Sequence, residues 1–200
     1  MGMDIVYVNP KGNEIQVVIH DKDIAILQRE GLSSYSIIYD DLESHYRSRL
    51  NPNLPMGGYH TYSEVVAFLD SIQLEHPSIV APKISIGNSL EGNEIWMIKI
   101  SDNPLVDEPE PEILLDALIH AREPESMEAL LYYIRWLTDN YGTDTGADSL
   151  ATFIVNNREL YFIPVLNPDG YLYNEATNPG GGGMWRKNRR PNGDGTYGVD

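Results

Sequence analysis

The stretch from residue 113 to residue 125 constrains the fold most strongly, because an apolar run ends there at a histidine. The run Ile113–Ile119 is short, and prolines bound it at positions 111 and 124. Short apolar runs with such boundaries are typical of buried strands. The sequence therefore predicts a buried strand that ends at His120.

A helix is predicted directly after this strand. Proline disfavours helical backbone in the residue before it, so Glu123 should lie outside the helix, and Pro124 fits the first helical position. Apolar residues then recur at helical spacing: Met127, Leu130, Leu131 and Ile134. His120 and Glu123 thus share a turn at the carboxyl end of a strand, which is where open α/β sheets bind ligands.

An imidazole and a carboxylate three residues apart can converge on one zinc ion. A catalytic zinc takes three protein ligands and keeps an open position for water. The alternative is a histidine that caps the strand end beside a solvated glutamate. The spacing of His120 and Glu123 alone is compatible with both interpretations.

The longer string His-Ala-Arg-Glu-Pro-Glu-Ser at 120–126 resembles the zinc-binding signature of the metallocarboxypeptidases, the carboxypeptidase A and T family. Other stretches match that family in the same order: 85–92, 167–171, 184–189 and 198–200. The resemblance covers about residues 57–200 and is closest to the bacterial carboxypeptidase T-like branch. It implies that the chain corresponds to the N-terminal portion of such an enzyme.

The resemblance implies a role for five residues. His120 and Glu123 would bind one Zn²⁺, and the guanidinium of Arg186 would polarise the scissile carbonyl. Arg122 would contact the substrate, although an ion pair with a nearby carboxylate is an equal alternative. Asp200 would accept a hydrogen bond from His120 and so orient the imidazole.

The implied activity is zinc-dependent release of C-terminal amino acids, with peptide or protein C-termini as substrates. In the family, the third zinc ligand and the glutamate base come after the residue that corresponds to Asp200. We therefore expect residues 1–200 alone to bind zinc weakly and to be inactive, and to self-associate through an unpaired strand edge. The alternative function is a catalytically inert fragment or a binding module that keeps the fold.

Composition limits the classes of molecule that the chain is expected to bind. The formal charge of −16 argues against nucleic acid and anionic membranes. Clustered carboxylates could bind calcium, or they could simply form a solvated acidic surface. The chain has no cysteine, no apolar run of membrane-spanning length and no signal peptide, so secretion is implied by the resemblance alone.

The predicted fold class is α/β, a mixed and mainly parallel sheet flanked by helices, incomplete at the C-terminus. A small N-terminal βαβα segment is expected from strands at 14–20 and 36–39 and helices at 22–30 and 41–50. A cluster of Pro, Gly and Asn at 51–58 indicates a linker. The expected domains are therefore a prosegment-like piece with its linker at 1–56, or an ordinary N-terminal extension, and the N-terminal part of the catalytic domain at 57–200.

Further elements are predicted along residues 57–200. Thr61 and Glu64 form the pattern of a capping box at the start of a helix. Strands are expected at 83–86, 94–100 and 160–166. From residue 167 onward, glycine, asparagine and proline dominate, which predicts a long loop.

Overall fold

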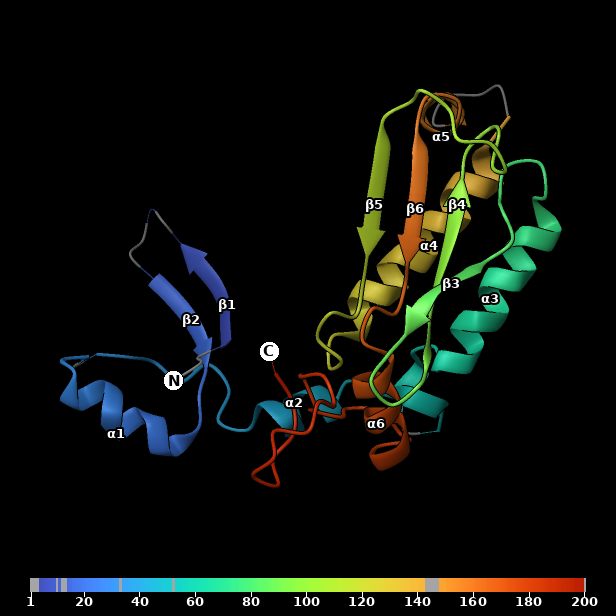
Figure 1. The fold of residues 1–200 in the computed structure, drawn as a ribbon. Helices are drawn as coiled ribbons and strands as arrows, with labels where there is room; N and C mark the ends of the chain where they lie inside the picture. Colours follow the sequence, from blue (N-terminus) through green and yellow to red (C-terminus); the bar gives the residue numbers. More distant parts are fainter. Residues whose placement is uncertain are drawn as a thin grey trace. The chain divides into compact units, whose positions relative to one another are not determined.

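The computed structural model describes residues 4–199 apart from residues 10, 12–13, 33, 52 and 143–147. The chain forms two compact units, Met1–Asp41 and Leu42–Asp200, which Figure 1 shows with their elements labelled. The boundary lies earlier in the chain than the predicted one between residues 56 and 57.

The first unit begins with a hairpin. Strand β1 (Asp4–Asn9) pairs antiparallel with β2 (Glu14–Val18), and α1 (Asp21–Arg29) follows. The predicted strand at 36–39 is wrong, since these residues form no strand and Ile37 and Ile38 are 58% and 56% exposed. The order is therefore β-β-α and not βαβα. A hairpin closes a short loop at low entropic cost, which favours β1 as the partner of β2.

The second unit is built around a four-stranded sheet in the order β3-β4-β6-β5. Its strands are β3 (Ile84–Asn88), β4 (Glu94–Ile100), β5 (Glu112–Asp116) and β6 (Glu159–Ile163). β4 pairs antiparallel with both β3 and β6, while β5 and β6 are parallel. The predicted mixed sheet is confirmed, but among the named strands only β5–β6 is a parallel pair, so "mainly parallel" was wrong for this part of the chain.

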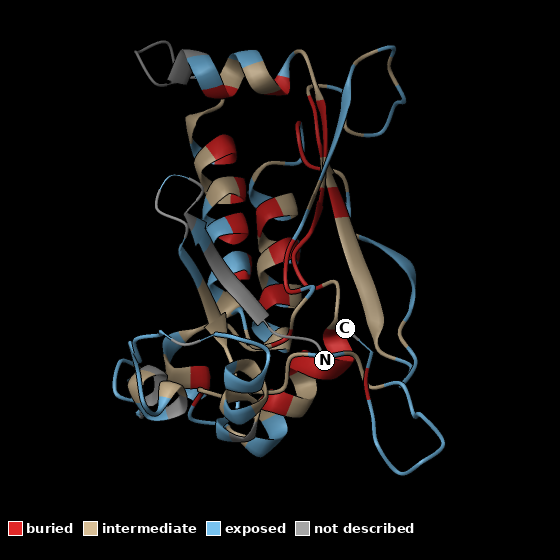
Figure 2. Ribbon diagram, turned by 90° about the vertical axis from the view of Figure 1, so that its left-hand side faces the viewer, coloured by how far each residue is buried: buried red, intermediate tan, exposed pale blue. Residues whose placement is uncertain are grey.

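Two long helices, α3 (Tyr62–Glu75) and α4 (Pro124–Asn140), cover one face of this sheet. Figure 2 shows the buried residues gathered between the helices and the strands. The largest of these side chains include Leu69, Ile72, Ile98, Ile134, Leu160 and Phe162. No helix in the described ranges is both long enough and apolar enough to cross a bilayer.

The capping box at the start of α3 is confirmed. The Glu64 N–H donates to the Thr61 hydroxyl (3.3 Å), and the Thr61 N–H donates to the Glu64 carboxylate (2.8 Å). The Thr61 N–H and then the Thr61 hydroxyl, which both donate to the Glu64 carboxylate, lower the pKa of Glu64. The helix entry is thus fixed by local chemistry, as the sequence indicated.

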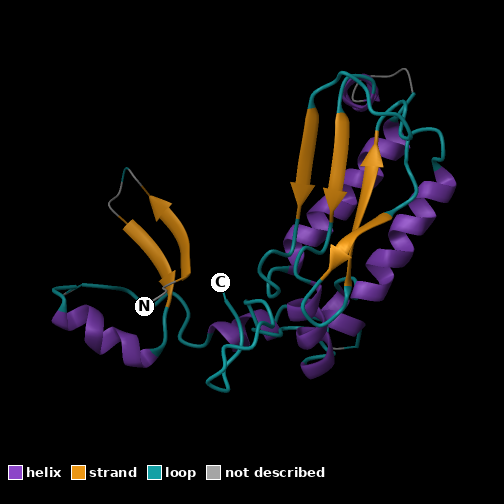
Figure 3. Ribbon diagram, in the orientation of Figure 1, coloured by secondary structure: helices purple, strands orange, loops and turns teal. Residues whose placement is uncertain are grey.

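The predicted loop after residue 167 is wrong over its first part. Residues Pro168–Thr177 form α6, and Asn167 caps it by accepting the Gly170 N–H at 3.1 Å (Figure 3). Asn at the cap and Pro at the first position are ordinary helix-start signals, which the glycine and asparagine content obscured. The remaining helical segments are α2 (Leu42–Arg47), the 3-10 turn η1 (Pro55–Gly58) and α5 (Asp148–Val155).

Candidate metal centre

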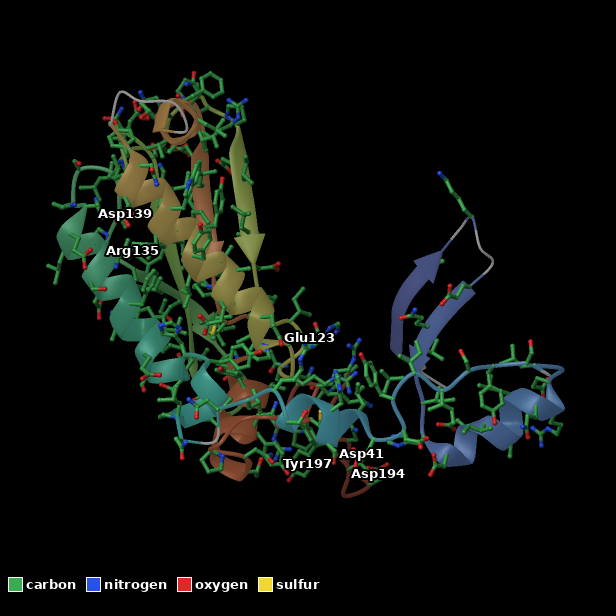
Figure 4. The ribbon with its side chains drawn as sticks, turned by 180° about the vertical axis from the view of Figure 1, so that it is seen from behind. Asp41, Glu123, Arg135, Asp139, Asp194 and Tyr197 are labelled. Carbon is green, nitrogen blue, oxygen red and sulfur yellow. The ribbon has the colours of Figure 1, made fainter. Side chains whose placement is uncertain are left out.

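His120 and Glu123 lie in the turn that joins β5 to α4. The predicted buried strand ending at His120 is wrong in its end and its burial, because β5 ends at Asp116 and lies at the edge of the sheet with Leu114 63% exposed. Glu123 is the N-cap residue of α4 and Pro124 opens the helix, which confirms the predicted helix start. The Glu123 N–H donates to the His120 carbonyl at 3.1 Å and closes the turn. Figure 4 labels Glu123 at this end of α4, with Arg135 and Asp139 further along the helix. The turn therefore lies at the carboxyl ends of the parallel pair β5–β6.

The backbone before this turn is strained. Leu118 is 1% exposed and has a φ of 52°, a left-handed conformation that bulky residues rarely adopt. Such a conformation costs about 1–3 kcal/mol and persists only where surrounding contacts enforce it. Ser126 supplies them, since its hydroxyl accepts the Leu118 N–H (3.1 Å) and donates to the Glu123 carbonyl (2.8 Å). Ser126, in the first helical turn of α4, thus holds both ends of the segment from Leu118 to Glu123.

The two side chains face one another. Nδ1 of His120 lies 3.1 Å from Oε2 of Glu123. Zinc bonds of about 2.0–2.2 Å at a tetrahedral angle place two ligand atoms roughly 3.4 Å apart, so this pair fits one zinc ion with a small adjustment. The side chains are 32% and 48% exposed, which leaves the site accessible to an ion and to water.

Arg186 reaches the same site from a distant part of the chain. Its Nη1 lies 3.2 Å from Oε1 of Glu123, while Oε2 of that carboxylate faces His120. The Arg186 side chain is 21% exposed. The structure therefore brings together the neighbouring His120 and Glu123 and a guanidinium that lies 63 residues after Glu123 in the sequence.

The predicted roles of two other site residues, Arg122 and Asp200, stay predictions. Arg122 lies half-buried on the turn between His120 and Glu123, and its contact with substrate stays a prediction. Asp200 lies outside the described residues, so its hydrogen bond to His120 also stays a prediction.

Carboxylates gather elsewhere in the second unit. Within the described residues, two groups of three acidic side chains are close enough to hold a metal ion, and neither includes His120 or Glu123. The groups are Asp102, Glu108 and Glu110, and Asp107, Glu112 and Glu159. Calcium binding, which the acidic composition suggested, stays a prediction. A third zinc ligand for the His120–Glu123 pair is not found among the described side chains.

The first acidic group gives a pH-dependent stability prediction. Burial, and then the charges of Asp102, Glu108 and Glu159, raise the pKa of Glu110 above its ordinary value of 4.5. A carboxyl whose pKa is raised by folding costs no stability below 4.5, and destabilises the fold increasingly as the pH rises through the folded pKa. We expect Glu110→Gln to raise the melting temperature slightly at pH 7 in the presence of a chelator, and to have no effect near pH 3.

The control for this prediction is Glu14→Gln, because Glu14 is an exposed carboxylate on β2 in the other unit. A melting temperature that rises equally in both variants, or a Glu110 effect that is independent of pH, would contradict the repulsion argument.

The sequence did not single out Asn174 on α6. Its side chain is 1% exposed and bonds both to Ala121, beside His120, and to Trp185, beside Arg186. The available signal was its spacing of seven from Asn167, which places both asparagines on one face of a helix.

Known proteins resemble the chain over these segments. The sequence family described as zinc carboxypeptidase matches residues 65–200. A zinc carboxypeptidase of Saccharothrix mutabilis subsp. capreolus is 44% identical over 135 residues, 68% of this chain and 30% of that protein. Carboxypeptidase A2 of Rattus norvegicus is 29% identical over 196 residues, 98% of this chain and 42% of that protein. The chain thus spans less than half the length of these curated relatives.

Solved structures agree with the fold. The crystal structure of carboxypeptidase A from Helicoverpa armigera matches with a TM-score of 0.75 and 25% identity, covering 99% of this chain and 50% of that one. Thrombin-activatable fibrinolysis inhibitor, TAFI, matches with a TM-score of 0.67 and 24% identity, covering 94% of this chain and 47% of that one. The second likeness supports the fold alone.

Proposed function

Because this chain belongs to the zinc carboxypeptidase family, we propose that it supplies the zinc-binding turn of a peptidase that releases C-terminal amino acids from peptides. The observation that carries the proposal is the 3.1 Å approach of His120 Nδ1 to Glu123 Oε2. Arg186, at 3.2 Å from the other carboxylate oxygen, adds a positive group beside the same point.

Each residue has a distinct task in this proposal. His120 and Glu123 hold one Zn²⁺, which when bound polarises a carbonyl and lowers the pKa of a bound water. Arg186 presents a fixed guanidinium to negative charge that develops on the carbonyl oxygen. Arg122 contacts the peptide from the same turn. Asp200 keeps the imidazole of His120 in one tautomer and orientation by accepting its other N–H.

The same proposal covers the first unit and the location. We assign residues 1–56 as a prosegment with its linker, supported by the family resemblance and by the separate compact unit Met1–Asp41. Residues 57–200 then belong to the catalytic domain. We also propose, on the family resemblance, that the protein is secreted.

Self-association is proposed through β5, which lies at the end of the sheet order. Leu114 is 63% exposed and Ile113 is 39% exposed on this strand. An end strand with exposed apolar side chains offers unpaired backbone groups to another chain. A second copy of the chain is the simplest partner for it.

The proposed function is tested with purified, metal-free residues 1–200. Zinc is added in competition with a chromophoric chelator, release of a C-terminal residue is followed by mass spectrometry, and light scattering reports the oligomeric state. We expect weak binding of one zinc per chain, no release and species larger than a monomer, because a catalytic zinc needs more ligands than the described pair supplies.

Different outcomes test different parts of the proposal. A chain that binds no zinc would remove the metal centre, whereas turnover by residues 1–200 would show that the two-ligand interpretation is incomplete. A purely monomeric chain would remove the β5 interface and leave the metal centre untouched.

A further inference from the structure

Helix α6 binds both segments that form the candidate metal centre. Asn167 lies at its N-cap and Asn174 lies two turns further along the same face. Asn174 is 1% exposed, so its amide can be satisfied only by protein groups or buried water. Where these two amides bind therefore shows what the helix holds in place.

Asn167 bonds to the residue before His120 and to the residue after Arg186. Its Nδ2 donates to the Ile119 carbonyl at 3.2 Å and to the Lys187 carbonyl at 3.1 Å. Ile119 precedes His120, and Lys187 follows Arg186. One amide thus ties the metal-ligand turn to the arginine segment.

Asn174 bonds to the residue after His120 and to the residue before Arg186. Its Nδ2 donates to the Ala121 carbonyl (3.0 Å) and to the Trp185 carbonyl (2.8 Å), and its Oδ1 accepts the Trp185 N–H (2.9 Å). Ala121 follows His120, and Trp185 precedes Arg186. Both donors and the acceptor of this buried amide are used on the same two segments.

The two segments also contact each other directly. The Ala121 N–H donates to the Arg186 carbonyl at 2.9 Å. The helix approaches both so closely that a Cβ on Gly170 would lie 2.7 Å from the Ala121 Cβ and 2.7 Å from the Lys187 carbonyl oxygen. Only a glycine permits this approach, so α6 forms a rigid support under the centre.

We propose that Asn167 and Asn174 form an asparagine clamp that positions His120 and Arg186 relative to one another. The four carbonyls that the clamp binds flank these two residues, so neither backbone can shift without breaking a bond. The clamp rests on the proposed function, since positioning matters only if His120 and Arg186 act at one centre. Neither asparagine touches the reacting atoms in this assignment, and both are positioning residues.

The decisive variant is Asn167→Asp. Aspartate keeps the oxygen that accepts the Gly170 N–H and is an equally good N-cap, so α6 should remain folded. It loses both donors to Ile119 and Lys187. Asn174→Asp removes the second pair of donors. The matched control is Asn157→Asp, because Asn157 lies two residues after the end of α5 and its amide donates to the Phe153 carbonyl of that helix, far along the chain from both clamped segments.

Two readouts are taken on the folded 200-residue chain, with melting temperature and circular dichroism confirming the fold. The first is zinc affinity by chelator competition, which should fall about tenfold in Asn167→Asp, the usual lower range for losing a group that orients a metal ligand. The second is the Nε–H resonance of Arg186 in metal-free protein, assigned by its loss in Arg186→Lys. It should move to the position of exposed arginines in Asn167→Asp and stay unchanged in Asn157→Asp.

A change in either readout that Asn157→Asp does not share supports the clamp, because loss of stability alone would move neither in a folded chain. No change in both readouts in folded Asn167→Asp overturns it, whether or not Asn174→Asp folds. If the unsubstituted chain binds no zinc, the proposed metal centre fails, and the Arg186 resonance alone then decides the clamp.

Discussion

Replacing Arg186 by lysine should lower kcat for release of a C-terminal residue by about 100- to 1,000-fold in a form of the protein that hydrolyses peptides. That range is the usual cost of losing one group that stabilises a developing oxyanion. Lysine keeps the positive charge but loses the planar fork and the fixed geometry of the guanidinium, which here contacts Glu123 at 3.2 Å. Zinc affinity should be unchanged, because the charge beside the carboxylate is kept.

The measurement is steady-state turnover on a short peptide together with zinc content. Arg190→Lys is the matched control, since Arg190 is an exposed arginine in the same segment. Turnover that is unaffected by Arg186→Lys, or a parallel loss in Arg190→Lys, would remove Arg186 from the carbonyl-polarising role.

Replacing His120 by alanine should weaken zinc binding by residues 1–200 on the order of 100-fold or more. Loss of a direct ligand should exceed the 10- to 100-fold cost of losing a partner of a ligand. Glu123→Gln should have a similar effect, because the amide cannot supply a charged oxygen. Chelator competition on metal-free protein measures both.

The chain provides a matched control in a second imidazole–carboxylate pair. Nδ1 of His60 lies 2.9 Å from the carboxylate of Glu128, closer than His120 lies to Glu123. His60→Ala should change zinc affinity by no more than about twofold, since this pair forms part of no proposed metal site. The reverse pattern, with binding lost in His60→Ala and kept in His120→Ala, would place the zinc at the His60–Glu128 pair and contradict the proposed metal centre.

Local signals predicted the fold best where the chemistry lies within a few residues. The start of α4 at Pro124 depends on adjacent residues and the capping box at Thr61 on a residue three positions away, and both are confirmed. The strand at 36–39 was wrong because an apolar run carries no information about its pairing partner, and β2 pairs with a segment earlier in the chain. The start of α6 was missed because its glycine and asparagine content outweighed the Asn-Pro helix-start signal.

The candidate site shows the same division. His120 and Glu123 share one turn, so their proximity could be expected from spacing, and the family motif suggested Arg186. The role of Asn174 could not be expected, because its amide bonds to backbone carbonyls whose position depends on the whole second unit. Every residue carries a backbone carbonyl, so the residue type does not indicate which carbonyl will accept a hydrogen bond.

The asparagine clamp also sets the order in which the centre can be completed during synthesis. Asn167 and Asn174 bond to carbonyls 48 and 53 residues earlier in the chain, and their other partners extend to Lys187. A ribosome adds residues from the N-terminus, so β5 and the following His120 emerge well before Asn167 and Asn174. The clamp can therefore form only after residue 187 has left the exit tunnel, whereas Ser126 can fix the backbone of the turn as soon as α4 forms.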